Sequence, residues 1–187
     1  MANTDAPFGL RPVKHLDGSP YNGAYNRYYV PTSETNNIFI GDPVGVGGSA
    51  DADGVPDVTR SAVNTAILGV VVGIEPVNSE SALYRAASAE AYVYVADAPD
   101  LVFEIQEDST GGAIAATSVG LNADIAITAG STAAARSNIE LDSSDVKTGT
   151  AQLRILGLAQ RADNSIGTNA NWLVMINEHA LKTTTGV

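Results

Sequence analysis

The sequence predicts a mainly β protein, an antiparallel β-barrel or sandwich with an extended N-terminal arm. Short apolar runs rich in β-branched and aromatic residues recur along the chain and are separated by turn residues. Helical signals are confined to alanine-dense windows at 112–118 and 132–136, which are too short to stand alone. Paired prolines and glycines near the N-terminus break regular structure. We therefore expect residues 1–36 to form the arm and residues 37–187 a barrel-like body.

The predicted arm concentrates aromatic residues. Four of the seven tyrosines of the chain lie between positions 21 and 29. Tyrosine combines a large apolar face with a polar tip, and it is enriched at protein–protein contacts. Two interpretations stay open: the tyrosines contact a partner, or they lie on the chain's own barrel as an edge strand.

The body is expected to contain nine or ten short strands at hairpin spacing, which is typical of a barrel or sandwich. The run 67–74 is apolar on both parities and suits a strand that is covered on both faces. Residues 91–95 and 101–106 are expected to pair as a hairpin through the loop 97–100, with one face of the second strand in the core and the other partly wet. If the body has two modules, we expect the division near 109–118. Further strands are expected at 37–40, 44–46, 125–127, 139–141, 153–158 and 172–177.

The charge and composition of the chain exclude several classes of function. The formal net charge is -11, and no Lys or Arg occurs between Arg85 and Arg136. Such a surface repels phosphates, so direct binding to nucleic acid is not expected. The chain has no cysteine, which excludes disulfides and thiolate metal sites. Neither a signal peptide nor an apolar run of membrane-spanning length is seen, so we expect no membrane partner and synthesis in a cytoplasm.

The sequence shows no convincing catalytic or cofactor-binding pattern. The two histidines stand apart from carboxylate clusters, and no Gly-x-Ser-x-Gly motif occurs. Asp51, Asp53 and Asp57 share a loop, but their spacing departs from the EF-hand, so an ordinary solvated loop is preferred over a calcium site. We assign no catalytic residue, metal or cofactor. A hydrolase that uses Asp97 or Glu104 is the catalytic alternative.

Short motifs scattered over most of the chain point to a family. They include Ala-Pro-Phe-Gly-Leu-Arg-Pro-Val at 6–13, Arg-Tyr-Tyr-Val-Pro at 27–31, Phe-Ile-Gly-Asp-Pro-Val at 39–44, Leu-Gly-Val-Val-Val-Gly at 68–73 and Ala-Arg-Ser-Asn-Ile-Glu-Leu-Asp at 135–142. In these motifs the chain resembles small virion proteins of tailed bacteriophages that are regarded as capsid decoration (cement) or head structural proteins. The resemblance implies a β-barrel-like body, assembly as trimers at local three-fold positions, and binding to capsid subunits from outside.

The expected function is therefore that of a non-enzymatic virion structural protein on the capsid exterior. Its expected partners are the major capsid protein and itself, as a homotrimer. The alternatives are a tail-tube or other head–tail virion protein, and a carbohydrate-binding β-sandwich with Trp172 and the tyrosines as stacking platforms, although Trp172 lies in an apolar run typical of a core. Because aromatic residues and arginine dominate binding hot spots, the residues expected to contact the partner are Phe8, Leu10, Arg11, Tyr21, Tyr25, Tyr28 and Tyr29.

Overall fold

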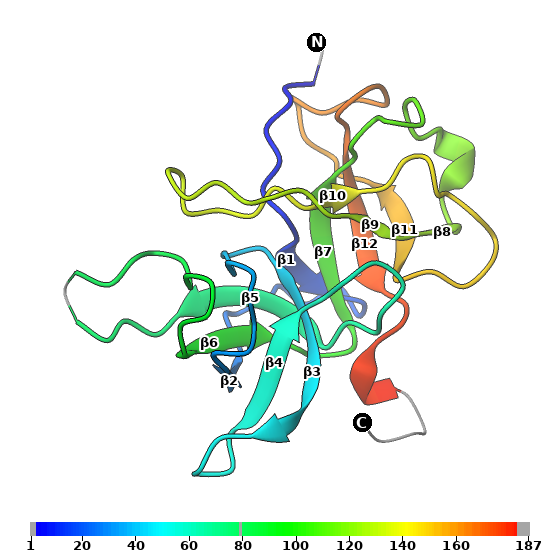
Figure 1. The fold of residues 1–187 in the computed structure, drawn as a ribbon. Helices are drawn as coiled ribbons and strands as arrows, with labels where there is room; N and C mark the ends of the chain where they lie inside the picture. Colours follow the sequence, from blue (N-terminus) through cyan, green and yellow to red (C-terminus); the bar gives the residue numbers. More distant parts are fainter. Residues whose placement is uncertain (1–2, 79, 183–187) are drawn as a thin grey trace.

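The computed structural model describes residues 3–78 and 80–182, and this part of the chain is mainly β, as predicted (Figure 1). The strands form a closed five-stranded barrel, an open five-stranded sheet and a two-stranded sheet. The helical elements among the described residues are two single turns of 3₁₀ helix, η1 (Ala116–Ser118) and η2 (Ala180–Lys182). Neither turn, nor any other helix in the described ranges, has the length and apolar character to span a bilayer.

The barrel closes because its last strand pairs with its first. A closed barrel with an odd number of strands must contain at least one parallel pair, since strand direction cannot alternate all the way around. Here the parallel pair is β2 with β4, which meet at Tyr29 and Asp57, and every other neighbouring pair is antiparallel. In order around the barrel the strands are β2 (Asn26–Val30), β4 (Pro56–Arg60), β3 (Pro43–Ala50), β5 (Gly69–Ile74) and β6 (Ala91–Ala96).

The open sheet is antiparallel throughout and draws on both ends of the chain. The two-stranded sheet, β9 (Ile125–Ala126) with β10 (Glu140–Leu141), adjoins it through a bridge between Glu107 and Leu141. In spatial order the strands of the open sheet are β1 (Arg11–His15), β7 (Leu101–Gln106), β12 (Asn171–Ile176), β11 (Leu153–Leu158) and β8 (Asn122–Ala123).

The predicted hairpin of 91–95 with 101–106 is wrong, although both strands form. β6 pairs with β2 and β5 in the barrel, whereas β7 pairs with β1 and β12 in the open sheet. Residues 97–100 carry the chain from one sheet to the other through a turn in which the Leu101 N–H donates to the Ala98 carbonyl. Both edges of each strand are occupied by other strands, so no edge is left for the hairpin. The division between the two β units falls here, not near 109–118.

Both faces of β7 are buried, whereas the sequence predicts one partly wet face. Glu104 is 5% exposed because Arg11 and Arg161 both pair with its carboxylate at 2.6 Å. Gln106 is 2% exposed, and its amide donates to the carbonyl of Thr4. The N-terminal residues therefore lie over the polar face of β7 and exclude water from it.

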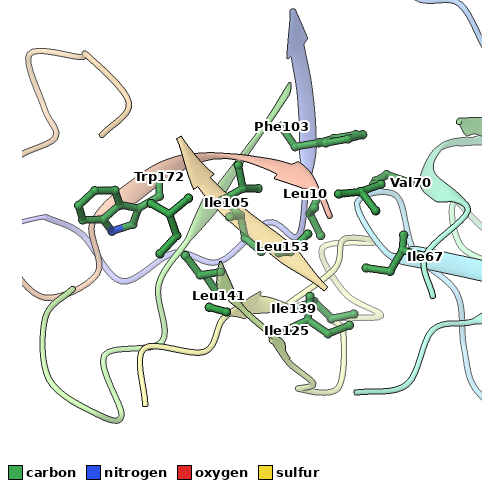
Figure 2. Packing of buried hydrophobic residues seen from close by; sticks show 14 of the residues in the cluster. Leu10, Ile67, Val70, Phe103, Ile105, Ile125, Ile139, Leu141, Leu153 and Trp172 are labelled. Atoms are coloured by element: carbon green, nitrogen blue, oxygen red, sulfur yellow. The ribbon is translucent and has the colours of Figure 1, made fainter. Parts of the chain in front are cut away.

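Strand β5 separates the hydrophobic clusters of the two β units and contributes side chains to both. One hydrophobic cluster fills the barrel. A larger one, part of which is drawn in Figure 2, lies between the open sheet and the two-stranded sheet. Val71 of β5 belongs to the barrel cluster, and its neighbour Val70 belongs to the larger cluster. Because successive side chains of a strand alternate between faces, β5 is covered on both sides, which confirms the prediction made from its two-sided apolar pattern.

The N-terminal segment does not stand apart as an arm. Within residues 3–36, β1 is the outer strand of the open sheet and β2 closes the barrel. Of the four clustered tyrosines, Tyr28 and Tyr29 lie on the chain's own barrel, in β2, while contact of the tyrosines with a partner stays a prediction. β2 is paired on both sides, however, and is not an edge strand. The expectation of an extended arm separate from the body is therefore corrected, because both of its strands pair within the body.

Candidate functional site

The outer surface of the barrel over β2 and β6 carries a cluster of tyrosines. In β2, Tyr28 lies in the barrel cluster, so Arg27 and Tyr29 point outward. In β6, Tyr92 and Tyr94 point outward by the same alternation. The register pairs Tyr29 with Tyr92 and Arg27 with Tyr94. We call this surface the tyrosine face and define it by Tyr25, Arg27, Tyr29, Tyr92 and Tyr94.

Ring contacts hold the tyrosine face in one arrangement. The centroids of the Tyr25 and Tyr94 rings are 4.6 Å apart, and those of Tyr29 and Tyr92 are 5.6 Å apart, both in tilted geometry. The Arg27 guanidinium carbon lies 3.4 Å from the centroid of the Tyr92 ring. Tyr25 remains 54% exposed. The face therefore presents aromatic surface to solvent that is already ordered.

Carboxylates surround the tyrosine face and bind its hydroxyls. The Tyr92 hydroxyl donates to Asp51 at 2.6 Å, and the Tyr29 hydroxyl donates to Glu90 at 3.1 Å. Glu75 accepts from Arg27 at 2.7 Å. The hydrogen bond from Tyr92 lowers the pKa of the Asp51 carboxyl, and the bond from Arg27 lowers the pKa of Glu75. Both groups are therefore charged at neutral pH, and the rim is acidic.

A groove of about 670 Å³ runs along this rim. Aromatic rings bordered by carboxylates attract cations, through the ring faces and through charge pairing. The same surface repels phosphates. This arrangement suits a basic protein segment in which Lys or Arg side chains lie against the rings. The side chains that line the groove include Tyr29, Tyr92, Asp51, Asp53, Glu75 and Glu90.

Two of the seven predicted contact residues, Tyr25 and Tyr29, belong to the tyrosine face. Two others are buried and offer no surface to a partner, so their prediction is wrong. Leu10 is 1% exposed in the larger cluster. Tyr28 is 9% exposed, and its hydroxyl donates to Asp97 at 2.6 Å inside the molecule. Because side chains alternate along a strand, Tyr28 points into the barrel and Tyr29 points out of it, which explains why two adjacent tyrosines differ in burial.

The remaining three, Phe8, Arg11 and Tyr21, lie at a second surface that we call the seam groove. It follows the line where β1 of the open sheet meets β5 of the barrel, and its volume is about 400 Å³. The Arg11 guanidinium lies 4.8 Å from the Phe8 ring centroid. The seam groove is lined mainly by apolar side chains, among them Phe8, Pro12, Tyr21, Ile40 and Val72, and by the exposed arginines Arg11 and Arg136.

Three of the five residues of the tyrosine face were not predicted from the sequence. Tyr92, Tyr94 and Arg27 were not among the predicted contact residues. Tyr92 and Tyr94 alternate in sequence with Val93 and Val95. In a strand this places the two tyrosines on one face and the two valines on the other, which indicates an outward aromatic pair. The pairing of β6 with β2, which brings these rings beside Tyr25 and Tyr29, is a long-range contact without a local signal.

The carboxylates considered for calcium serve to shape the β3–β4 hairpin. Asp51 accepts the backbone N–H groups of Asp53 and Val55 with one oxygen, and Asp57 accepts the N–H of Ser49. Over residues 3–78 and 80–182, no group of three or more His, Cys, Asp or Glu side chains is placed to hold a metal ion.

The two carboxylates considered for hydrolysis, and the tryptophan considered for sugar binding, are likewise engaged inside the molecule. Asp97 accepts from Tyr28 and Asn26, and Glu104 is clamped by two arginines. Trp172 is fully buried, as expected for a core residue, and its Nε1–H donates to Glu107 at 2.8 Å. Trp172 therefore offers no ring face for a sugar.

A scan against protein-family models and searches of curated proteins and of solved structures found no match to this chain. Two surfaces stand out on geometric grounds: the acidic tyrosine face and the apolar, arginine-lined seam groove.

Proposed function

We propose that this chain is a non-catalytic virion structural protein that binds the outside of a tailed-phage capsid and stabilises the shell. The tyrosine face is the observation that carries the proposal. It is an ordered, partly exposed cluster of four tyrosines and one arginine, and these residue types are enriched among binding hot spots. The sequence motifs that resemble phage decoration proteins support the choice of partner.

The tyrosine face binds through ring stacking and charge in this proposal. Its acidic rim selects a basic segment on the outer surface of the capsid subunit, and the tyrosine rings pack on the aliphatic and cationic parts of Lys and Arg side chains. Because the rings are already held by cross-strand contacts, binding immobilises few additional side chains. The partner is thus the major capsid protein, and nucleic acid is disfavoured by the acidic rim.

Shell stabilisation follows from repetition of this contact. A specific interface buries about 1,600 Å² in total, and a protein that touches neighbouring capsid subunits must be released before those subunits separate. If three copies act together, as the resemblance implies, the second and third contacts form at high effective concentration. Many weak sites then add up to a large mechanical effect.

The test uses capsid shells that lack the protein. Purified chain is added, and saturation binding and the melting temperature of the shell are measured. The double variant Tyr25→Ala with Tyr94→Ala is expected to bind at least about tenfold more weakly, because each is an aromatic hot-spot candidate worth more than about 1 kcal/mol. Ile166→Ser is the matched control, since Ile166 is 50% exposed on a different loop.

The proposal fails if the unaltered chain does not bind shells, or if the double variant binds as tightly as the control. Assembly into stacked rings or filaments in solution would instead favour the tail-tube alternative.

A further inference from the structure

The connection between β5 and β6 carries the most exposed large hydrophobic side chains among the described residues. It projects away from the barrel to one side of the molecule (Figure 1). Val77 is 87% exposed and Leu83 is 74% exposed. Glu80 lies between them in sequence and is exposed, and its carboxylate makes no hydrogen bond or ion pair to any described residue. We call Val77, Glu80 and Leu83 the loop triad.

The connection is anchored at its base. Arg85 is 2% exposed, and its guanidinium donates to the carbonyls of Pro31, Glu34, Asn36 and Ala89 at 2.6–2.8 Å. These bonds fix the backbone two residues after Leu83. The apolar side chains are thus exposed on a segment whose base is held by the body.

The seam groove has the complementary character. It is mainly apolar, and its lining residue Ile40 is 44% exposed. Two exposed arginines belong to it, and of these Arg136 has no acidic partner within 4.0 Å among residues 3–78 and 80–182. In a chain with a net charge of -11, an apolar groove that contains two arginines is an exception. None of its lining residues comes from the β5–β6 connection of the same molecule.

We propose that the loop triad of one copy docks in the seam groove of a second copy of this chain. Val77 and Leu83 enter the apolar lining, and Glu80 pairs with Arg136. Two features select a second copy as the occupant: both halves of the contact are present on the same chain, and their charges are opposite. The rings of the tyrosine face take no part. Of the loop triad, Val77 also lines the groove along the rim of that face, whereas Glu80 and Leu83 do not.

The contact is heterologous, because the loop triad and the seam groove are different patches. Repetition of a heterologous contact generates a closed ring when the rotation between copies closes. The inference therefore specifies how the small oligomer of the proposed function is built, and in that respect it rests on that function. The contact itself is tested in solution without shells, so its failure is separable from failure of shell binding.

The first test is a cysteine cross-link. The chain has no cysteine, so the variants Leu83→Cys and Ile40→Cys each contain one thiol. Both side chains are substantially exposed, so neither substitution perturbs the core. Mixed and oxidised, the two variants are expected to give a covalent dimer that neither gives alone. Leu83→Cys mixed with Ile166→Cys is the control and is expected to give background cross-linking.

The second test is a charge exchange, read as molecular mass against concentration. Glu80→Lys and Arg136→Glu are each expected to weaken association by about fivefold or more, and the double variant to recover it, because the pair is restored with reversed sign. Val77→Ser with Leu83→Ser is expected to weaken association by about tenfold or more through lost apolar burial.

A chain that stays monomeric at every concentration overturns the inference. So does an oligomer that is insensitive to these variants and gives no Leu83–Ile40 cross-link. If shells still bind such a chain through the tyrosine face, the proposed function stands while this contact is discarded.

Discussion

The buried guanidinium of Arg85 offers the sharpest test of the fold. Its four donor contacts join the segment 31–36 to the segment 85–89, and the backbones of Arg85 and Ile38 also exchange hydrogen bonds. Each acceptor is a backbone carbonyl, and no carboxylate of the described residues lies within 4.0 Å of the guanidinium nitrogens. Replacing Arg85 by Ala removes every donor at once and leaves these carbonyls without that partner.

The expected cost follows from the hydrogen bonds. A hydrogen bond to a charged group contributes about 1.5–3 kcal/mol, and contributions within one network are not additive. We therefore expect Arg85→Ala to lower the free energy of unfolding by about 3–5 kcal/mol. Arg85→Lys keeps the charge but has a single compact donor group, so we expect about half of that loss. In a protein of this length, 1 kcal/mol shifts the melting temperature by about 2–4 °C.

Thermal unfolding followed by circular dichroism measures the effect. We expect the melting temperature of Arg85→Ala to fall by about 6–20 °C, with Arg85→Lys intermediate. Arg154→Ala is the control, because Arg154 is exposed and, within the described part of the chain, its side chain donates a single hydrogen bond, to Asn122. The reasoning is refuted if Arg85→Ala melts within about 2 °C of the unaltered chain, or if Lys and Ala cost the same.

Three further predictions concern other parts of the molecule. Burial and neighbouring carboxylates raise the pKa of Glu140 from 4.5 to about 7. The folded state therefore holds the proton more tightly than the unfolded state, and the stability that this provides is full below pH 4.5 and is lost as the pH rises through 7. Glu140→Gln should accordingly be more stable than the unaltered chain at pH 8, by on the order of 1 kcal/mol, and equal to it at pH 4, as urea titrations would show. The fluorescence emission of Trp172, the sole tryptophan, should be blue-shifted because its ring is buried; an emission maximum typical of exposed indole would contradict this. Trp172→Phe should lower the free energy of unfolding in urea by about 1–3 kcal/mol, because the buried carboxylate of Glu107 loses a hydrogen-bond donor. Gly9→Ala should destabilise far more than Gly18→Ala in thermal unfolding. Both glycines have positive φ, but a Cβ at position 9 would lie 2.3 Å from a backbone oxygen, whereas a Cβ at position 18 would meet no atom within 4 Å. Equal melting temperatures of the two variants would contradict the close packing described for position 9.

The two surfaces divide the proposed work of the molecule. The tyrosine face lies on the outer surface of the barrel, over the paired strands β2 and β6. The seam groove lies where the barrel meets the open sheet. A variant of the tyrosine face should therefore lose shell binding and keep self-association. A variant of Glu80 or Leu83, neither of which lines the groove of the tyrosine face, should lose self-association first. Measurement of both properties on both variants separates the two proposals.

Local pattern was sufficient to predict the strands and part of the candidate site. The runs at 91–95 and 101–106 are rich in β-branched and aromatic residues. Both form strands whose bounds lie within one residue of the predicted ones. Tyr25 and Tyr29 were identified from tyrosine clustering alone. The same clustering also selected Tyr28, which is buried, because composition carries no information about which face of a strand a residue occupies until the strand's partner is known.

Composition is sufficient to predict the acidic character of the chain, and local pattern is sufficient to predict the mainly β class and the positions of most strands, because strand signals come from residues near one another along the chain. The tertiary structure alone decided which strands pair, that a five-stranded barrel and an open sheet share β5 as a wall, and that residues near the N-terminus cover β7. Strand pairing joins residues far apart in sequence. Each strand has two edges, and any of several other strands could form the backbone hydrogen bonds that each edge requires. Burial, and with it the composition of both candidate surfaces, follows from that choice.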